Sequence, residues 1–583
     1  MNNDNRNFMI FAVLAVLLLF AWPLVMSRVM PPANPPVTKV ENGKSQPLPS
    51  TTAPASSKPV AVRDRNIVLK QTPRVRIVTP TLNGSINLKG ARIDDLVLTR
   101  YGETIEKNSP PIRLLSPAGS ADAYFAEFGW GAGDGITAPG PDTVFTASSP
   151  VLTPETPVTL DWVSPAGLHF RIRLAIDDHY MFTVEQAVGN SGAQPLKIQP
   201  YSLISRVGVS KDPASVNHVG PIGVFSGGVD YGISYDNLKG KETNFFSRIW
   251  NGSGLSGANY FDSTGGWAGF GDKYWLTALI PDQSATTHIG FKAASADDHF
   301  QADITRAQAT VAPGKVLVTT TRFFAGAKEV KTIDGYESQL KIAHFGRAID
   351  WGWFEIIEKP IFYYLDWLFR MIGNFGVAIM LLTLTIRLLI FPIAQRQFAS
   401  MAAMKAIQPK MKALQEKYKD DKTRQQQEVM ALYKAEGVNP LAGCAPTLLQ
   451  IPIMYSLYKV LMLTIEMRHQ PFVGWIKDLS APDPWTILNL GGTLPYTLPA
   501  FLAIGIVPVL LGISMWLQFK MNPQAMDPAQ AQVFAFMPWV LMFVMAPFAV
   551  GLQVYWITSN LLTVLQQRVL YARHPVLRQA AAK

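Results

Sequence analysis

Cysteine and charge are both scarce in this 583-residue chain, and each scarcity excludes a class of protein. The single cysteine, Cys444, excludes an intramolecular disulfide framework and a thiolate metal cluster. The eight histidines lack the spacing of metal ligands, so no metal site is predicted. Only 16% of residues are charged against 48% hydrophobic, which is typical of a membrane protein rather than of a single soluble domain.

The apolar residues gather at the N-terminus and after about residue 350. Residues 8–26 form an apolar run behind Arg6 that resembles a secretory signal. No small-residue cleavage site follows it, so a retained transmembrane anchor over residues 1–28 is favoured over a removed signal. Residues 29–61 are rich in Pro, Ser and Thr and cannot bury a core, which predicts a flexible periplasmic linker.

Residues 62–347 have the period of two that is typical of strands. In HFRIRLAID (169–177) apolar residues alternate with mostly polar ones, and similar short runs recur between Gly, Pro, Asn and Asp. The pattern predicts a large antiparallel β-sandwich. Aromatic residues in GGWAGFGDKYW could bind a sugar or a peptide, but core positions are the favoured interpretation for Trp267, Tyr274 and Trp275.

Residues 348–372 have a helical period and an amphipathic distribution. On a helical wheel, one narrow sector carries the charges and the opposite side is apolar: Glu355, Lys359, Asp366 and Arg370 against Ile357, Ile361, Tyr364, Leu365 and Leu368. A soluble surface helix would show the same pattern. The position directly before a membrane span favours a helix that lies in the membrane interface.

That span, GVAIMLLTLTIRLLIFPIAQ (376–395), carries Arg387 near its middle. Twenty helical residues reach roughly 30 Å, the thickness of a hydrocarbon core. An arginine at that depth costs at least about 2.5 kcal/mol, so it normally faces a partner or a hydrated cavity. No Asp or Glu lies well inside the C-terminal apolar stretches, which leaves Arg387 without an obvious carboxylate partner.

Four further spans are predicted after this one, at residues 446–465, 499–519, 534–547 and 552–570. Together with the anchor they make six transmembrane helices, five of them in a core over residues 373–583. Basic residues outnumber acidic ones in a helical hairpin at 396–438 and in the C-terminal tail. By the positive-inside rule both are cytoplasmic, as is the N-terminus, and the β-domain is periplasmic.

Uncharged polar residues on the same span and on the neighbouring helices could form a hydrated wall around Arg387. They are Thr383, Gln450, Tyr555, Ser559 and Asn560. Such a groove would let a polar peptide segment enter the bilayer without contacting hydrocarbon. Alternatively, Arg387 snorkels to the cytoplasmic interface and the polar residues join helices. No nucleophile, metal cluster or phosphate-binding glycine loop accompanies them, so a non-enzymatic role without a cofactor is predicted.

The hairpin is the second candidate for contacts. Its charged residues around the predicted turn are Lys410, Lys412, Lys417, Asp420, Asp421, Lys422 and Arg424. They could contact ribosomal RNA, anionic lipid or protein, or form an ordinary solvated surface.

Several long motifs resemble the YidC-type membrane protein insertases of Gram-negative bacteria, within the YidC/Oxa family. They are TLTIRLLIFPIAQRQFASMAAMKAIQPKMKAL, YKAEGVNPLAGCAPTLLQIPIMYSLYKVL, FVGWIKDLSAPDP and GLQVYWITSNLLTVLQQRVL in the C-terminal region. The segments GSINLKGARIDDLVL and GGWAGFGDKYWLTALIP resemble the periplasmic domain of that family.

The resemblance implies an all-β supersandwich, an interfacial helix and a five-helix core with a hydrophilic groove. It assigns groove positions to Arg387, Thr383 and Tyr555, and Trp556 stands where some relatives have a second tyrosine. It also implies an inner-membrane insertase and chaperone for nascent membrane proteins. The implied partners are the bilayer, the Sec translocon, the ribosome and the signal recognition particle.

Two other functions compete with this one. A small-solute transporter would usually show inverted repeats or matched discontinuous helices, and the sequence shows neither. An envelope-binding protein would use the β-domain for a glycan and the helices only as an anchor.

Overall fold

The computed structural model divides into two compact units, Met1–Asp350 and Trp351–Lys583. It describes residues 39–41, 44–46, 62–133, 136–210, 218–225, 227–239, 258–294, 298–419, 421–436, 445–488, 504–521 and 528–573. The predicted anchor 1–28 lies outside the described residues. Within the predicted linker, two short strands, β1 (Lys39–Glu41) and β2 (Lys44–Gln46), pair antiparallel.

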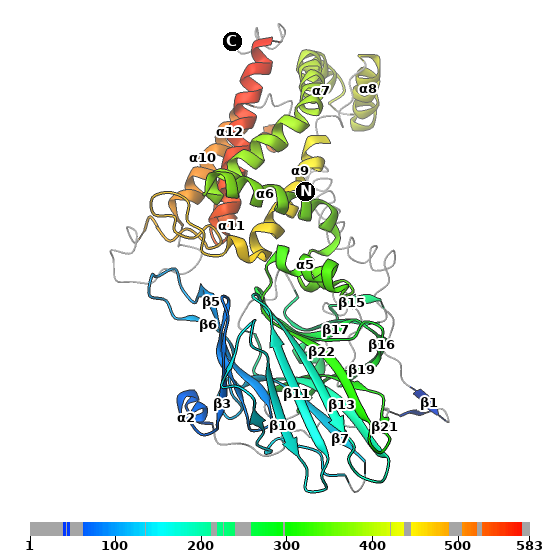
Figure 1. Cartoon of the computed structure of the whole chain (residues 1–583). Coiled ribbons are helices and arrows are strands. Elements are labelled where there is room, and N and C mark those ends of the chain that lie inside the picture. The colour runs from blue at the N-terminus through cyan, green and yellow to red at the C-terminus, as the bar shows by residue number, and fades with distance from the viewer. Residues whose placement is uncertain are drawn as a thin grey trace. The chain divides into compact units, whose positions relative to one another are not determined.

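One sheet of the first unit contains nine of the described strands (Figure 1). In spatial order they are β15 (Gly228–Asp230), β14 (Gly220–Phe225), β17 (Trp267–Gly271), β18 (Trp275–Pro281), β22 (Val316–Ala327), β12 (Met181–Gly189), β11 (His169–Ile176), β10 (Val158–Val163) and β8 (Thr146–Ala147). The predicted alternation in residues 169–177 is confirmed in β11, where the apolar residues are buried and most residues between them are exposed.

The second sheet contains eleven of the described strands. Its main path is β16 (Asn259–Thr264), β19 (Thr286–Ala294), β20 (His299–Arg306), β13 (Leu196–Val207), β7 (Tyr124–Ala132), β5 (Arg92–Gly102), β4 (Leu82–Asn87), β3 (Arg74–Val78) and β9 (Val151–Leu152). In addition, β21 (Ala309–Val311) pairs with β13 and β6 (Pro111–Leu115) with β5. The β3–β9 pair is parallel.

The core of the sandwich lies between the two sheets and is rich in aromatic rings. Phe270 and Phe323 are fully buried there, and Trp267 is fully buried on the other face of its sheet, against Phe345. Burial of each such side chain contributes about 1.5–3 kcal/mol relative to exposure. Trp267 therefore occupies a core position, as predicted. The helices of the unit within the described residues are short: α2 (Arg65–Leu69), α3 (Tyr235–Leu238) and α5 (Val330–Leu340), followed by the 3-10 turn η1 (Phe345–Ala348).

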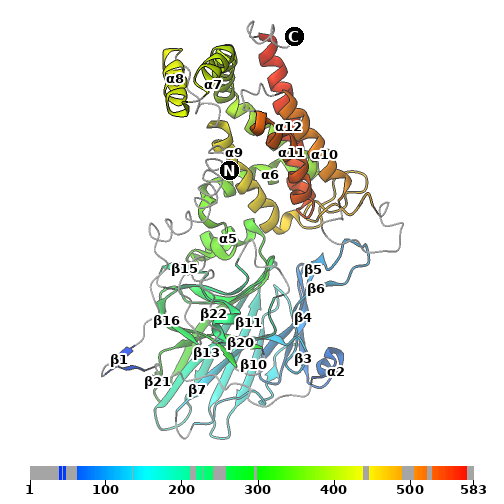
Figure 2. The same ribbon diagram turned by 180° about the vertical axis from the view of Figure 1, so that it is seen from behind.

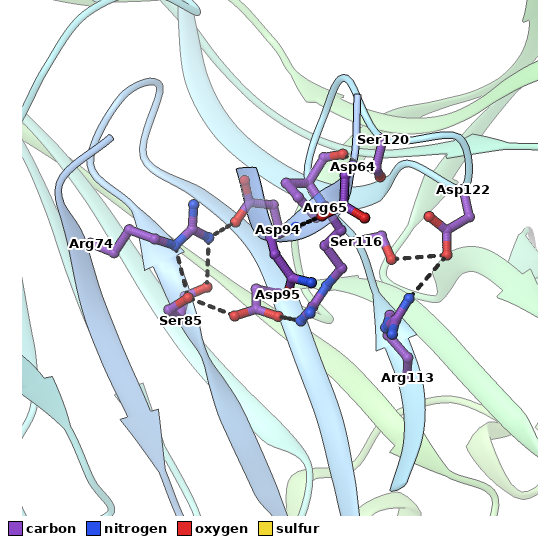
Figure 3. A network of polar contacts seen from close by, with 12 residues as sticks. Asp64, Arg65, Arg74, Ser85, Asp94, Asp95, Arg113, Ser116, Ser120 and Asp122 are labelled. Carbon is purple, nitrogen blue, oxygen red and sulfur yellow. Dashed lines mark hydrogen bonds and ion pairs between the residues drawn. The ribbon is translucent and has the colours of Figure 1, made fainter. Parts of the chain in front are cut away.

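A buried ionic network joins α2 to strands β3, β4 and β5 (Figure 3). Arg74 pairs with Asp94 and donates to the Ser85 hydroxyl over 2.8 Å. Ser85 in turn donates to Asp95 over 2.7 Å, and Asp95 pairs with Arg65 of α2. Burial raises the pKa of Asp94, and the neighbouring Arg74 opposes that shift. The helix α2, which follows the predicted linker, is thereby attached to the sheet by charges that compensate each other.

The second unit is helical, as predicted for the C-terminal region (Figures 1 and 2). Its elements are η2 (Gly352–Phe354), α6 (Glu355–Ile372), α7 (Phe375–Lys417), α8 (Lys422–Ala435), α9 (Ala445–Leu463), η4 (Ile465–Met467), α10 (Ile506–Met521), α11 (Pro528–Met545) and α12 (Val550–Arg573). In both views α8 lies beside the C-terminal part of α7, at the same end of the unit as the C-terminus of α12.

These helices overlap the predicted spans with shifted ends. Within the described residues one helical segment, 375–393, has the length and hydropathy to cross a bilayer, and shorter apolar segments lie at 506–521 and 535–545. The helix α11 begins at Pro528, upstream of the predicted start at residue 534. The number of membrane spans remains a prediction.

The helix α7 joins the Arg387 span and the first helix of the hairpin into one continuous element. It contains Pro392 and Pro409, where proline removes a backbone hydrogen bond and bends a helix. Its membrane part contacts α6 and α12, and its distal part contacts α8. The predicted turn lies between the end of α7 and the start of α8, although Asp420 itself is outside the described residues.

The orientation of α6 corrects the helical-wheel prediction. Asp366, expected in the exposed charged sector, is only 6% exposed, and Glu358 is fully buried. Asp366 can be buried because Arg370, one turn later, approaches its carboxylate to 2.9 Å. Conversely, Trp367 and Met371 are 52% and 67% exposed, so the exposed arc of α6 is largely apolar.

Candidate functional site

The site is centred on a contact between α7 and α12. The Arg387 guanidinium donates a hydrogen bond to the Ser559 hydroxyl over 2.5 Å. Arg387 is partly buried and Ser559 is 2% exposed. Among the described residues, no carboxylate forms an ion pair with Arg387. Its positive charge is therefore solvated by a neutral hydroxyl and is not neutralised by an acid.

A second polar contact lies one turn earlier on α12. Gln450 of α9 donates its amide to the hydroxyl of Tyr555, which is 1% exposed. Because Tyr555 and Ser559 are four residues apart, they lie on one face of α12. This face therefore joins α9 at Tyr555 and α7 at Ser559.

Two other predicted groove residues, Asn560 and Thr383, are buried in the helical unit. Asn560 donates to the Ser514 hydroxyl of α10 over 3.0 Å, and both side chains are buried. Thr383 is also buried and donates to the carbonyl of Ile379 in its own helix. The partly accessible members of the predicted set are Arg387, Gln450 and Trp556. The other four are buried: Tyr555, Ser559 and Asn560 join α12 to α9, α7 and α10, and Thr383 bonds within α7.

Close packing at the first turn of α12 brings the helices near enough for these contacts. A Cβ added to Gly551 would lie 3.5 Å from Ile379 of α7 and 3.6 Å from Leu461 of α9. The start of α7 is defined by Asn374, whose side chain accepts a hydrogen bond from the Val377 amide over 3.1 Å. The site is consequently built on helices with fixed ends.

Two buried charges were missed by the sequence analysis. Lys459 of α9 is 3% exposed, and Glu358 of α6 is fully buried. The helices α6 and α9 contact each other. Lys459 lies nine residues after Gln450, which puts the two on opposite faces of α9. The sequence signal for Lys459 was a charged residue inside a predicted span, the same signal that identified Arg387.

The hairpin residues form contacts mainly within the hairpin. Lys410 of α7 pairs with Glu436 over 2.6 Å, and Asp421 accepts the Arg424 amide at the start of α8. Lys417 and Arg424 both lie over the ring of Tyr418. Nothing is described of the side chains of Lys412 and Lys422.

Two family models together match most of the chain. The YidC periplasmic domain matches residues 74–364, and the 60Kd inner membrane protein matches residues 367–577. A membrane protein insertase YidC from Zymomonas mobilis subsp. mobilis is 48% identical, over 98% of this chain and 96% of the relative. The chain belongs to the YidC family of membrane protein insertases. A YidC from Rickettsia rickettsii is 42% identical over 97% of this chain and 99% of its own length.

A solved structure described as an active YidC insertase with its first transmembrane domain resolved also matches. It is 16% identical and covers 87% of this chain and 93% of its own, with a TM-score of 0.36. Membership of the YidC family is shown by the sequence relatives and the family models.

Proposed function

We propose that this YidC-family protein inserts nascent membrane proteins through a polar path in which Arg387 is the accessible charge. The observation that supports the proposal is the hydrogen bond between Arg387 and a hydroxyl, without a carboxylate among the described residues. An arginine solvated in this way keeps an electric field that attracts acidic or carbonyl-rich segments. Gln450 and Trp556 would border the same path, and Thr383, Tyr555, Ser559 and Asn560 would support it from behind.

A membrane topology follows from the same proposal. Six spans, a periplasmic β-domain and cytoplasmic termini agree with the basic hairpin and tail and with the shared end of α8 and α12. The exposed apolar arc of α6 suits a helix that lies in the membrane interface. Relatives of the family are bacterial inner-membrane proteins, and we place this chain in the same membrane.

The proposed role needs no covalent chemistry and no cofactor. The described residues contain no group of three or more His, Cys, Asp or Glu side chains that could hold a metal ion. Nascent membrane proteins are the proposed substrates. The ribosome, the signal recognition particle and the Sec translocon are proposed partners, on the family resemblance alone, with the hairpin residues Lys410, Lys417, Asp421 and Arg424 as candidate contacts.

Replacement of Arg387 tests this function. We expect Arg387→Gln to reduce insertion of a reporter with an acidic translocated tail by at least about tenfold, which corresponds to ~1.4 kcal/mol. Arg387→Lys keeps the charge and should retain most of the activity. A reporter with an uncharged tail is the matched control and should be affected less. Normal insertion of the acidic reporter by Arg387→Gln, at normal protein levels, would contradict the proposal.

A further inference from the structure

The loop between α9 and α10 contacts the first turns of three helices that carry the site. We call residues Phe472–Asp483 the interhelical clamp. The first amides of a helix have no partner within that helix, so a segment that accepts their hydrogen bonds can fix where the helix begins. The clamp does this for α10 and α12, and it holds α7 through a side-chain contact.

The contact with α10 is made by Asp483. Its Oδ2 accepts the Val507 amide over 2.8 Å, although the two residues are 24 positions apart. Its Oδ1 accepts the Trp475 indole N–H over 3.1 Å and the Trp485 amide over 3.0 Å. The carboxylate is 6% exposed, and a Cβ added to Gly505 would lie 2.5 Å from the Asp483 side chain. Asp483 therefore acts as an N-cap supplied by another segment.

The contact with α12 is made by backbone groups of the clamp. The amide of Val550 donates to the Ala481 carbonyl, and the amide of Gly551 donates to the Leu479 carbonyl, both over 2.9 Å. These are the first two residues of the helix that carries Tyr555 and therefore orient its polar face. A shift of the clamp would move both amides together.

The contact with α7 completes the set. Asn374, which caps α7, donates its side-chain amide to the Phe472 carbonyl over 2.9 Å. Gly376, in the first turn, packs so closely on the Phe472 ring that a Cβ there would clash. Arg387 lies three turns further along the same helix.

We propose that the interhelical clamp sets the spacing of α7, α10 and α12, and that Asp483 is the positioning residue for α10. The clamp thereby brings Ser514 to Asn560 and Ser559 to Arg387. This inference rests on the proposed polar path for its functional meaning, but the spacing of the helices can be measured without any substrate.

Cysteine crosslinking within the full-length protein tests the spacing directly. In a Cys444→Ser background, the pair Ser514→Cys and Asn560→Cys reports on α10 against α12. The pair Gly512→Cys and Met542→Cys reports on α10 against α11, where an added Cβ at Gly512 would lie 3.3 Å from Met542. We expect Asp483→Ala to reduce both crosslinks at least threefold, because both pairs report on the position of α10.

Asp478→Ala is the matched control, because the described hydrogen bonds of Asp478 are to Ser480 within the loop. It should leave both crosslinks intact. Asp483→Asn keeps one acceptor oxygen and should retain more of the first crosslink than Asp483→Ala. This second variant keeps the inference testable if the alanine variant accumulates poorly. An unchanged first crosslink in Asp483→Ala and Asp483→Asn, or an equal loss in Asp478→Ala, would overturn the inference. Normal insertion by Arg387→Gln would instead count against the polar path alone.

Discussion

Two arginines, one in each unit, are compensated in different ways. In the β-domain, Arg206 of β13 donates to both oxygens of Asp272, over 2.9 and 3.1 Å, and its guanidinium lies 4.8 Å from the Tyr124 ring centroid. In the helical unit, Arg387 donates to the hydroxyl of Ser559. Arg206 is buried and Arg387 is partly buried, and of the two only Arg206 has a carboxylate that neutralises it among the described residues.

On the proposed function, Arg206 has a structural charge and Arg387 has a charge that a substrate would use. The Arg206–Asp272 pair is complete within the fold, and removal of one member leaves the other buried and alone. Arg387 keeps its net charge, so a passing peptide can still gain from it. Changes at Arg206 should therefore affect stability first, and changes around Arg387 should affect insertion first.

The largest effect is expected from Arg206→Ala. It would leave the Asp272 carboxylate buried without its cation and lower the free energy of unfolding of the β-domain by about 3–5 kcal/mol. Thermal unfolding followed by tryptophan fluorescence would measure this. Arg171→Ala is the control, because its pair with Asp161 is exposed and should contribute about 0–1 kcal/mol. Equal effects of the two variants would contradict the structural role of the buried pair.

A smaller effect is expected from Ser559→Ala. The loss of the hydroxyl removes the hydrogen bond to Arg387, which should cost about 1 kcal/mol and slow insertion of the acidic reporter roughly fivefold. Thr558→Ala is the control, since the Thr558 hydroxyl donates to the Val554 carbonyl of its own helix. Rates measured in proteoliposomes would separate the two. The hydrogen bond would have no functional role if both variants matched the parent protein.

The smallest effect concerns pH in the β-domain. Burial lowers the pKa of His218 below 6.5, although the hydrogen bond that its Nε2 donates to the Pro221 carbonyl oxygen over 2.6 Å opposes this shift, because the protonated ring can donate it as well. Below pH 6.5 the unfolded chain therefore binds a proton that the folded state resists, so stability falls as pH decreases and is unaffected above that value. His218→Gln should flatten this acid limb in unfolding measurements from pH 7.5 to 5. His179→Gln should not, and an unchanged slope in His218→Gln would refute the assignment.

Local pattern predicted much of the fold from the sequence. The alternation in β11 identified a strand because one face of the strand is buried and the other is largely exposed. Helical periodicity also located α9 and α12 to within a few residues of their observed ends. It failed for α6, because a helical wheel gives the direction of each side chain but not the position of the neighbouring helices, and Asp366 proved to be buried.

The candidate site was only partly predictable for the same reason. Polarity inside apolar segments singled out Arg387, Gln450 and Tyr555 one by one, but their mutual contacts depend on which helices are neighbours. Asp483 contacts α10 across a sequence separation of 24 residues, and no local sequence pattern predicts this contact. Lys459 was visible in the sequence, yet its burial depends on tertiary packing.

The most direct measurement of the central claim is site-specific photocrosslinking to a ribosome-stalled nascent membrane protein. A photoreactive phenylalanine derivative at Trp556, which is partly accessible, would report on the polar path. The same group at Leu565, nine residues later on the opposite side of α12 and 59% exposed, would report on the lipid-facing surface. We predict nascent-chain adducts at Trp556 that exceed those at Leu565 and that decrease in the Arg387→Gln background. Adducts confined to Leu565, or adducts at Trp556 that are independent of Arg387, would contradict the account.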